Sequence, residues 1–491
     1  MKRGSGVILP IFSLPHSYGI GSLGHEAYNF VDFLEDSNIR YWQLLPIGQT
    51  SIFSGNSPYS SISSFAGNPY FIDYDILFSE GLIQREDYIY LDNGNNYSRI
   101  NYDLVDKNKK LVLKKAYETF KSKNNFEEID EFFNENEFWL RDYCLYMTLR
   151  KRYGLDWSKW PKEYSNRVEK DLNDFWNENL DEINYYIFIQ YEFFSQYYNL
   201  KKYANDKGIE IIGDIPIYVS FDSSDCWAYS KYFQLDDNFN PKRVSGAKPD
   251  AFNEEGQLWG HPLYDWEKLK NNNYEFWLDR IKYNKNLYDI IRLDHFIGFI
   301  NYYAIEVGAT SAKNGIWMDG PGVDLFNFLE SNIDDLKLIV EDLGVLTNKV
   351  LEIKDQFNYP GMNVIQFAFS DNKIDQRNLP HNYVKNSAVY SSTHDSETFF
   401  TWLYSLEGEK KYRVFDYLFV RDSYMDAIKY LMSTTSDLCI FSFQDLYGLD
   451  NNSRINIPGI PRGQWEWRID FFYNREDIKG KIRYFAKLYD R

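Results

Sequence analysis

Eight short apolar runs, most ending in turn or polar residues, are the feature that most limits how this chain can fold. Most are near-continuous rather than alternating, which is typical of parallel strands buried on both faces. Helical patterns lie between them, as in residues 26–37. Strands that alternate with helices predict an α/β fold of the (β/α)8 barrel type. The runs are residues 6–11, 41–46, 209–214, 290–295, 338–344, 363–367, 388–395 and 439–445.

The spacing of these runs predicts insertions. We expect one (β/α)8 domain over residues 1–491, because barrels with insertions exceed about 400 residues. A large, mostly helical insertion, about residues 75–206, is predicted between strands two and three. A second insertion, about residues 215–288, is predicted between strands three and four. Insertions of this kind typically wall a substrate groove.

Composition and charge exclude several classes of function. The net charge of -18 argues against nucleic-acid binding, which needs clustered Lys and Arg. No run of about 18 apolar residues is present, so no membrane span is expected. The first apolar run carries Pro10, which favours a strand over a signal peptide. Cys144, Cys226 and Cys439 are an odd, scattered set that favours reduced thiols and a cytoplasmic location.

Aromatic residues make up 19% of the chain, with 42 tyrosines and 13 tryptophans. One interpretation is a tyrosine-rich core and surface. The other is a set of flat platforms for sugar rings, with phenol groups as hydrogen-bond partners. Composition leaves both interpretations open.

Polar groups end five of the eight predicted strands. The carboxyl ends of barrel strands meet at one mouth, where catalytic groups of such barrels lie. One alternative is that each acid caps the following helix or anchors a loop, and for Asp445 this is as plausible as a catalytic role. A metal site is the other alternative, but no histidine-rich or paired-carboxylate spacing accompanies these groups, so no metal and no cofactor are expected. The groups are Asp214, Arg292 with Asp294, Glu341, His394 with Asp395, and Asp445.

Several carboxylates without a metal suit the cleavage of a glycosidic bond. One carboxylate attacks the anomeric carbon, and a second, protonated one gives its proton to the leaving oxygen. Crowded acids raise one another's pKa, which keeps the donor protonated near neutral pH. Arg292 precedes Asp294 by two residues and shares its strand face. The spacing therefore favours Asp294 as the nucleophile and Arg292 as its orienting cation.

Three motifs around these groups resemble a known family. "RLDHF", "VEDLG" and "STHDSET" resemble the nucleophile, acid/base and transition-state motifs of 4-α-glucanotransferases. These are the amylomaltases, or disproportionating enzymes, of glycoside hydrolase family 77 in the α-amylase superfamily. Seven further motifs follow in the family's order, and the resemblance covers nearly the whole chain, least clearly the helical insertion. They are "LPIFSLPHSYGIGSLG", "GNSPYSSISSFAGNPYFID", "GDIPIYVSFDSSDCWA", "GQLWGHPLYDW", "NGIWMDGPGVDLF", "YPGMNVIQFAF" and "PRGQWEWR".

The resemblance implies roles for the matching positions. Asp294 is the expected nucleophile, Glu341 the expected general acid/base, and Asp395 the third carboxylate, which holds the 2- and 3-hydroxyls of a distorted sugar ring. The implied substrate-binding residues are Ser57, Tyr59, Asp214, Gln257, Trp259, Arg292, His394 and Gln464.

The same resemblance implies the reaction and its partners. A segment of an α-1,4-glucan is transferred through a covalent glucanyl-Asp intermediate to the 4-hydroxyl of another glucan or of glucose. Maltooligosaccharides are the expected donors and acceptors. Two alternatives remain: an α-glucan hydrolase with the same carboxylates, and a catalytically silent glucan-binding barrel.

Four positions depart from the family's usual motifs. Ile297 stands where many relatives carry arginine, Ser396 and Glu397 alter the usual "THDNDT", and Gln464 replaces a common asparagine. The three carboxylates are present, so these departures bear on acceptor preference and rate rather than on the chemistry.

Overall fold

The computed structural model describes residues 1–491 except 124–125, 250–253, 345, 370–375 and 461. Parts of two predicted insertions and the proline of "PRGQWEWR" therefore lie outside the described residues. Among the described residues, no helix has the length and apolar character that crossing a membrane requires.

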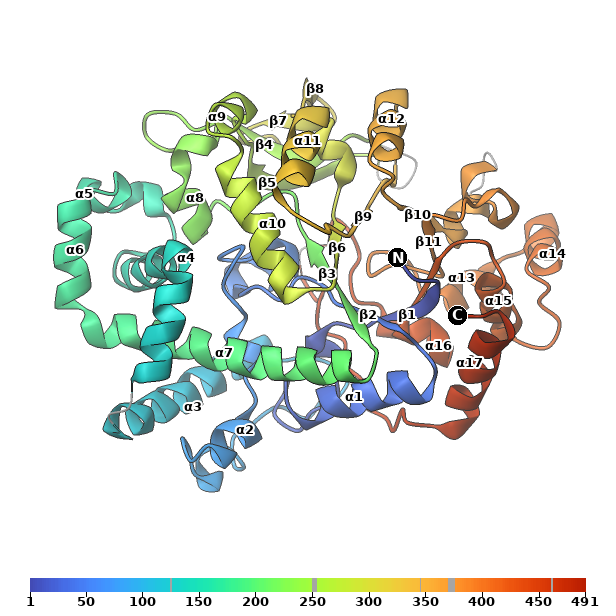
Figure 1. Ribbon diagram of the computed structural model, residues 1–491, viewed down its shortest axis with the longest axis horizontal. Coiled ribbons are helices and arrows are strands. Elements are labelled where there is room, and N and C mark those ends of the chain that lie inside the picture. Colours follow the sequence, from blue (N-terminus) through green and yellow to red (C-terminus); the bar gives the residue numbers. More distant parts are fainter. Residues whose placement is uncertain (124–125, 250–253, 345, 370–375, 461) are drawn as a thin grey trace.

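A closed barrel of eight parallel strands lies at the centre of the molecule (Figure 1). Every predicted strand run contributes one strand, so the predicted fold class is confirmed. The order around the barrel is β1-β12-β11-β10-β9-β6-β3-β2, and β1 pairs with both β12 and β2 to close it. The strands are β1 (Gly4–Ile8), β2 (Tyr41–Gln43), β3 (Glu210–Ile215), β6 (Ile290–Leu293), β9 (Leu338–Val340), β10 (Gly361–Val364), β11 (Ser387–Tyr390) and β12 (Leu438–Ser442).

The register of three neighbouring strands positions the polar strand ends. Asp214 of β3 is paired with Arg292 of β6, and Leu293 of β6 is paired with Val340 of β9. Asp294 and Glu341 each follow the last of these paired residues, so both emerge at the same level of the barrel mouth. Because side chains alternate along a strand, Arg292 and Asp294 share one face.

Among the described residues, six α-helices lie between β2 and β3, and most of them form the lobe at the left of Figure 1. The long helices α4 and α7 pack against each other, and α7 leads back into β3. Their apolar faces are rich in aromatic residues, which explains much of the tyrosine content. The helices are α2 (Tyr74–Ser79), α3 (Tyr102–Lys123), α4 (Glu127–Tyr153), α5 (Lys162–Ser165), α6 (Glu169–Glu178) and α7 (Leu180–Asp206).

A second, antiparallel sheet of order β5-β4-β7-β8 was not found from the sequence. Its strand β5 alternates between partly buried and exposed residues, so it lacks the continuous apolar run that marked the barrel strands. This strand carries Gln257 and Trp259. The sheet consists of β4 (Arg243–Ala247), β5 (Gln257–Pro262), β7 (Asn301–Glu306) and β8 (Ile316–Asp319).

The remaining helices surround the barrel or connect its strands (Figure 1). They are α1 (His25–Asp36), α8 (Ser224–Ala228), α9 (Trp266–Asn271), α10 (Glu275–Leu287), α11 (Val323–Asn332), α12 (Asn348–Gln356), α13 (Phe399–Ser405), α14 (Gly408–Tyr417), α15 (Tyr424–Met432), α16 (Phe443–Tyr447) and α17 (Glu476–Leu488).

Many of the aromatic side chains belong to the core. Trp42, Trp157, Trp227 and Trp277 are among the largest fully buried side chains. The indole N–H of Trp42 donates to the Leu9 carbonyl at 2.8 Å, which satisfies its only polar atom. All three cysteines are buried and unpaired. For the four buried tryptophans, the interpretation of the aromatic content as core packing holds.

Gly213 of β3 tests how tightly the barrel is filled beside the site. A methyl group at this position would lie 2.0 Å from Cδ2 of Tyr288. We expect Gly213→Ala to lower the free energy of unfolding by about 1–3 kcal/mol, because the surrounding side chains must shift. Gly480→Ala is the control, since Gly480 lies inside α17 and the nearest atom is 3.7 Å away.

The control should stabilise the protein by about 0.5–1 kcal/mol through helix propensity. Urea unfolding of both variants measures the difference. Equal stability of Gly213→Ala and the wild type would contradict this account of the packing.

Candidate active site

A buried ion pair between neighbouring strands lies at the barrel mouth. Nη1 of Arg292 donates to both carboxylate oxygens of Asp214, at 2.6 and 2.7 Å. The same nitrogen donates to Oδ1 of Asp294 at 3.0 Å. The side chains of Arg292 and Asp214 are almost fully buried, whereas that of Asp294 is 24% exposed. Arg292 thus joins a buried carboxylate to one that opens to the mouth.

Tyr59 extends this network from the loop after β2. Its phenol donates to Oδ2 of Asp214 at 2.7 Å. Its ring stacks on His394, with centroids 5.1 Å apart and planes 19° apart. Ser57 caps the short helix that carries Tyr59, because its hydroxyl accepts a hydrogen bond from the Tyr59 N–H. Ser57 therefore positions Tyr59 within the site.

Glu341 is held by the backbone that surrounds Asp294. The N–H of His295 donates to Oε2 of Glu341 at 2.8 Å, and the N–H of Leu343 donates to Oε1 at 2.9 Å. His295 adopts a left-handed conformation with φ 49°, at the start of the short 3-10 turn that follows Asp294. The residue directly after Asp294 thus fixes the second carboxyl group beside it.

Burial and charge act together on Glu341. Burial raises the pKa of Glu341, the negative charge of Asp294 raises it further, and Arg292 and the two backbone donors oppose both. The resulting pKa is about 8. A carboxyl group with this pKa is largely protonated at neutral pH and can serve as a proton donor.

Asp395 has the opposite balance. Partial burial raises its pKa, but the charge and hydrogen bond of His394 and the amide of Asn456 outweigh burial and lower the pKa to about 2. Nε2 of His394 lies 3.3 Å from Oδ1 of Asp395, and Nδ2 of Asn456 donates to the same oxygen at 2.6 Å. Arg454 donates to the backbone carbonyl of Asp395 at 2.5 Å. Asp395 is therefore a fixed, charged acceptor at the mouth.

Trp259 reaches the same region from the antiparallel sheet. Its ring meets that of His295 edge to face, with centroids 4.8 Å apart. Its indole N–H donates to the side-chain oxygen of Gln257 at 3.0 Å. Strand β5 thus brings both predicted residues to the loop that carries Asp294.

Gln464 is linked to the site through the loop that contains Asn456 and Ile457. Its side-chain oxygen accepts a hydrogen bond from the Ile457 N–H at 2.7 Å, so it fixes the loop that contains Asn456. The neighbouring Trp465 contacts the rings of Tyr59 and His394. The structure therefore brings all eleven predicted site residues into one connected region.

The other departures from the family's motifs have structural places. Ile297 is 5% exposed and packs in the core. The hydroxyl of Ser396 accepts a hydrogen bond from the Thr393 N–H at 2.7 Å and closes the turn that carries Asp395. The backbone carbonyl of Glu397 accepts a hydrogen bond from Gln366.

Asp445, for which two interpretations were open, is fully buried. Its carboxylate accepts hydrogen bonds from the hydroxyls of Ser391 and Ser392 and from the N–H of Phe399 at 2.7 Å. These partners occupy both oxygens and tie the start of α13 to β11. Asp445 lies inside α16, whose N-cap is Ser442, so it does not cap the helix that follows its strand and instead anchors the segment between β11 and α13.

Sequence reasoning missed Asn456, Arg454 and Trp465, which contact the predicted residues directly. Asn456 and Arg454 lie in a loop beyond β12 where no periodic pattern marks a function. Trp465 lies within the quoted motif "PRGQWEWR", so the motif itself was the available signal.

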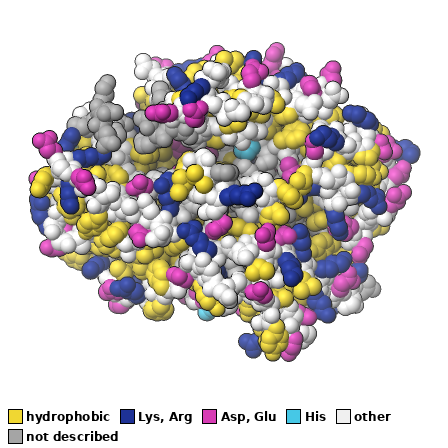
Figure 2. Space-filling model, turned by 180° about the vertical axis from the view of Figure 1, so that it is seen from behind, with side chains coloured by type: hydrophobic (Ala, Val, Ile, Leu, Met, Phe, Trp, Pro, Cys, Tyr) yellow, Lys and Arg dark blue, Asp and Glu magenta, His cyan; other side chains and the backbone are white. Residues whose placement is uncertain are grey.

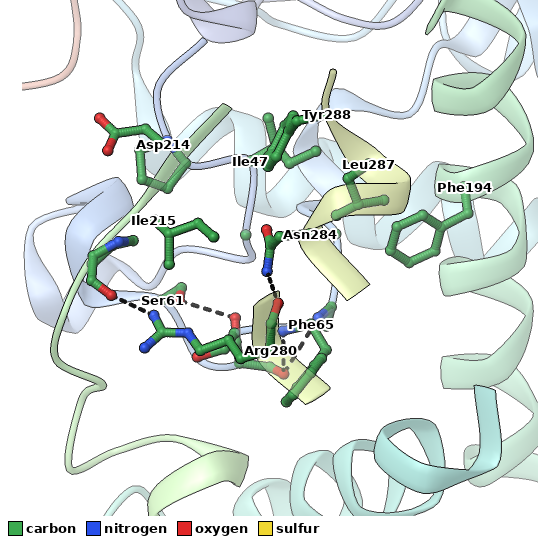
Figure 3. A pocket seen from close by; sticks show the side chains of 17 residues that line it. Ile47, Ser61, Phe65, Phe194, Asp214, Ile215, Arg280, Asn284, Leu287 and Tyr288 are labelled. Atoms are coloured by element: carbon green, nitrogen blue, oxygen red, sulfur yellow. Dashed lines mark hydrogen bonds between the residues drawn. The ribbon is translucent and has the colours of Figure 1, made fainter. Parts of the chain in front are cut away.

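A small cavity behind Asp214 has a volume of about 30 Å³, enough for roughly one or two water molecules and too small for a sugar. Figure 3 shows Asp214, Tyr288, Asn284 and Arg280 around it. Arg280 of α10 donates to the carbonyls of Pro216 at 2.6 Å and Ile217 at 3.1 Å. The cavity thus belongs to the support behind β3 and not to the open mouth.

His16, Asp73 and Asp75 form the one group of described residues that could gather around a metal ion. Nδ1 of His16 already accepts a hydrogen bond from the Tyr18 N–H, and Nε2 lies 3.0 Å from Asp73. Asp73 also accepts hydrogen bonds from Ser22 and from the first turn of α2. The ligand atoms of His16 and Asp73 are committed to holding two loops together.

The face seen in Figure 2 is hollowed near its middle, where a histidine side chain is visible. Acidic and basic side chains are interspersed around the hollow. Over the described part of this face, the mixed signs favour a neutral ligand over a highly charged polymer.

The arrangement combines a protonated carboxyl, a second carboxyl beside an arginine, and a charged third acceptor. Such a set can protonate a leaving oxygen, attack the carbon that loses it, and bind the neighbouring hydroxyls. These are the steps that cleavage of a glycosidic bond requires.

Comparisons with known proteins point the same way. A family model described as 4-alpha-glucanotransferase matches residues 9–473. A 4-alpha-glucanotransferase of Clostridium butyricum is 43% identical over 488 residues, which cover 98% of this chain and 99% of the relative. A 4-alpha-glucanotransferase of Thermus thermophilus is 38% identical over 483 residues, which cover 96% of this chain and 95% of the relative. The solved structure of amylomaltase from Streptococcus agalactiae in complex with acarbose matches with a TM-score of 0.96 at 34% identity and covers 100% of both chains.

The pKa of Glu341 is directly testable. Carbon-13 NMR titration should show a glutamate carboxyl that titrates near pH 8 in the wild type. In Asp294→Asn the pKa should fall, because a negative charge that raises it is removed. The spectrum of Glu341→Gln identifies the signal by its loss. An unchanged Glu341 pKa in Asp294→Asn would show that the two groups are not electrostatically coupled.

Proposed function

The chain belongs to the family of 4-α-glucanotransferases and has the activity of that family, and on this premise we propose which residues carry the reaction. The resemblance that the motifs indicated is thereby confirmed. In our proposal Asp294 is the nucleophile, Glu341 the general acid/base and Asp395 the residue that stabilises the transition state. The observation that carries this assignment is the raised pKa of Glu341 beside Asp294, which Arg292 orients.

The first half of the proposed reaction breaks an α-1,4 bond. Glu341 gives its proton to the glycosidic oxygen, and the bond from that oxygen to the anomeric carbon breaks. A carboxylate oxygen of Asp294 forms the new bond to this carbon, so a glucanyl ester remains on the enzyme. The shortened donor leaves with a free 4-hydroxyl.

The second half transfers the glucanyl group. Glu341, now deprotonated, takes the proton from the 4-hydroxyl of an acceptor, and the acceptor oxygen attacks the anomeric carbon. The ester bond to Asp294 breaks, and its carboxylate is restored. Two displacements at one carbon retain the α configuration.

We propose that Asp395 accepts hydrogen bonds from the 2- and 3-hydroxyls of the reacting ring. Its pKa of about 2 keeps it charged throughout the working range, and His394 and Asn456 fix its orientation. Charged acceptors form stronger hydrogen bonds with hydroxyls than neutral ones do. Tyr59, Trp259 and Gln464 are proposed to contact the sugars on either side.

The proposed donors and acceptors are maltooligosaccharides and other α-1,4-glucans, with glucose as a further acceptor. The Streptococcus agalactiae amylomaltase, with which this chain shares its fold over its whole length, was solved with acarbose. The alternative is that water, rather than a sugar hydroxyl, resolves the ester, which would make the protein a hydrolase.

Incubation with maltotriose, without metal or nucleotide, separates these outcomes. We expect a ladder of longer chains together with glucose, at a constant number of reducing ends, because each transfer makes one bond for each bond broken. Asp294→Ala should abolish the ladder and still bind maltooligosaccharides. Rising reducing ends with only shorter products would identify a hydrolase. Normal turnover by Asp294→Ala would exclude Asp294 as the nucleophile.

Trp259→Ala tests the proposed sugar contact. We expect KM for maltotriose to rise about 3- to 10-fold, with a smaller change in kcat, because one aromatic contact is lost. Trp317→Ala is the matched control, since Trp317 is an exposed tryptophan of the same sheet whose ring contacts Tyr303 and not a proposed site residue. An unchanged KM in Trp259→Ala would assign Trp259 a purely structural role.

A further inference from the structure

The loop that carries Tyr59 is closed by a short stretch of paired backbone. Residues 47–49 and 66–68 run antiparallel, with N–H donors 3.0 and 3.3 Å from the carbonyls opposite them. We call these two segments the loop base, and Tyr59 lies in the chain between them. The position of Tyr59 therefore depends on what holds the loop base in place.

Gln190 of α7 binds the loop base with its side chain. The N–H and C=O of Gly67 point away from the segment opposite, as alternate residues of an antiparallel pair do. Oε1 of Gln190 accepts a hydrogen bond from this N–H at 2.8 Å, and Nε2 donates to this carbonyl at 3.1 Å. Gln190 is 0% exposed, and a buried amide is costly without its partners. The pair of hydrogen bonds thus fixes Gly67 relative to α7.

Gly67 has no room for a side chain, because α7 lies directly against it. A methyl group at this position would lie 1.9 Å from Cδ1 of Phe193. Phe193 and Gln190 are three residues apart and therefore share one face of α7. This face holds Gly67 by shape as well as by hydrogen bonds.

Tyr143 of α4 holds the other segment of the loop base. It is fully buried, its phenol donates to Oε1 of Gln49, and the same phenol accepts a hydrogen bond from Nε2 of Gln190 at 3.3 Å. Gln49, Tyr143, Gln190 and Gly67 thus form one chain of hydrogen bonds across the loop base. Both long helices of the insertion after β2 take part in it.

The rest of the loop has contacts of its own. The Ser64 N–H donates to Oδ2 of Asp225 at 2.7 Å, and the Ser224 N–H donates to the Ile62 carbonyl at 2.8 Å. These partners come from α8 and do not involve Gln190. Loss of the Gln190 amide should therefore displace the loop base without unfolding the loop.

The contacts of Tyr59 in the site tolerate little displacement. Its phenol lies 2.7 Å from Oδ2 of Asp214, and its ring lies 5.1 Å from that of His394. A hydroxyl hydrogen bond is confined to about 2.5–3.0 Å, and a misplacement of about 1 Å in an active site can cost about 100-fold in rate. A shift of the loop base would reach the site through these two contacts.

From these observations we propose that Gln190 is a positioning residue for the transfer reaction. It fixes the loop base to α7, and the loop base holds Tyr59 against Asp214 and His394. The inference rests on the proposed function of the site, because Tyr59 is a proposed sugar contact. The helical insertion then serves the reaction directly and is more than an outer wall.

A double-mutant cycle with maltotriose tests the proposal. We expect Gln190→Met, which removes the amide and keeps an unbranched chain, to lower kcat/KM about 10- to 100-fold. In the Tyr59→Phe background the same change should cost less than about 3-fold, because the hydroxyl that the loop positions is already absent. Equal losses in both backgrounds would overturn the positioning role and leave Gln190 a purely structural residue.

Gln190→Glu is the conservative rescue. A protonated carboxyl can donate to the Gly67 carbonyl and accept from its N–H, whereas a carboxylate can only accept. Burial raises the pKa of such a carboxyl, so the neutral form prevails at low pH. The ratio of the variant's kcat/KM to that of the wild type should therefore be high at about pH 6 and fall toward about pH 9. A ratio that does not change with pH would contradict the proposed hydrogen bonds.

Gln196→Met is the matched control on the same helix. Gln196 is 2% exposed, and its Oε1 accepts a hydrogen bond from the Asp73 N–H at 2.7 Å, outside the loop base. We expect a comparable loss of stability in urea and a kcat/KM within about 2-fold of the wild type. A loss of kcat/KM as large as that of Gln190→Met would show that any buried amide of α7 has this effect, and would overturn the assignment to Gln190.

Tyr143→Phe repeats the test should Gln190→Met not fold. It removes the phenol between Gln49 and Gln190, and we expect kcat/KM to fall about 3- to 10-fold, again with a smaller loss in the Tyr59→Phe background. Full activity of both variants beside an active wild type would overturn this inference and leave the proposed function intact. A wild type that makes no ladder of longer chains would contradict the proposed function and, with it, this inference.

Discussion

The ion pair between Arg292 and Asp214 is the interaction on which the catalytic region depends. Both side chains are nearly fully buried, and a buried charge is strongly unfavourable without a partner. The pair satisfies this requirement because the strand register sets the two residues opposite each other on β6 and β3. Removing either partner would leave an uncompensated charge inside the barrel. The fold and the site are therefore linked through one contact.

Further hydrogen bonds link that pair to residues on both sides of the mouth. Arg292 also donates to Asp294, and Asp214 also accepts from Tyr59. Tyr59 stacks on His394, which lies beside Asp395. A chain of direct contacts thus joins two of the proposed catalytic carboxylates. Each member restricts the rotamers of the next, which preorganises the region.

The sequence predicted the barrel because its strands are buried on both faces and read as continuous apolar runs. It predicted the main polar groups because they follow those runs directly. It did not predict the antiparallel sheet, whose strand β5 is only half-buried and shows no such run. Nor did it predict Asn456 and Arg454, which reach Asp395 from a loop whose path depends on tertiary contacts such as that of Gln464 with Ile457. The position of Asp445 after a predicted strand also did not reveal its role, since structural anchoring and catalysis use the same residue type.

The environment of Glu341 fits both halves of the proposed reaction. Burial and the charge of Asp294 favour its neutral form, whereas Arg292 and the N–H groups of His295 and Leu343 favour its charged form. Before the first displacement the neutral form prevails, and Glu341 can donate a proton. Once Asp294 is esterified, its negative charge no longer raises the pKa of Glu341. Arg292 and the two N–H groups still lower this pKa, so the pKa of Glu341 falls. The same carboxyl group then acts as a base toward the acceptor hydroxyl. The covalent step itself therefore switches the protonation of its partner, and the fold supplies this switch by holding both groups at one level of the barrel.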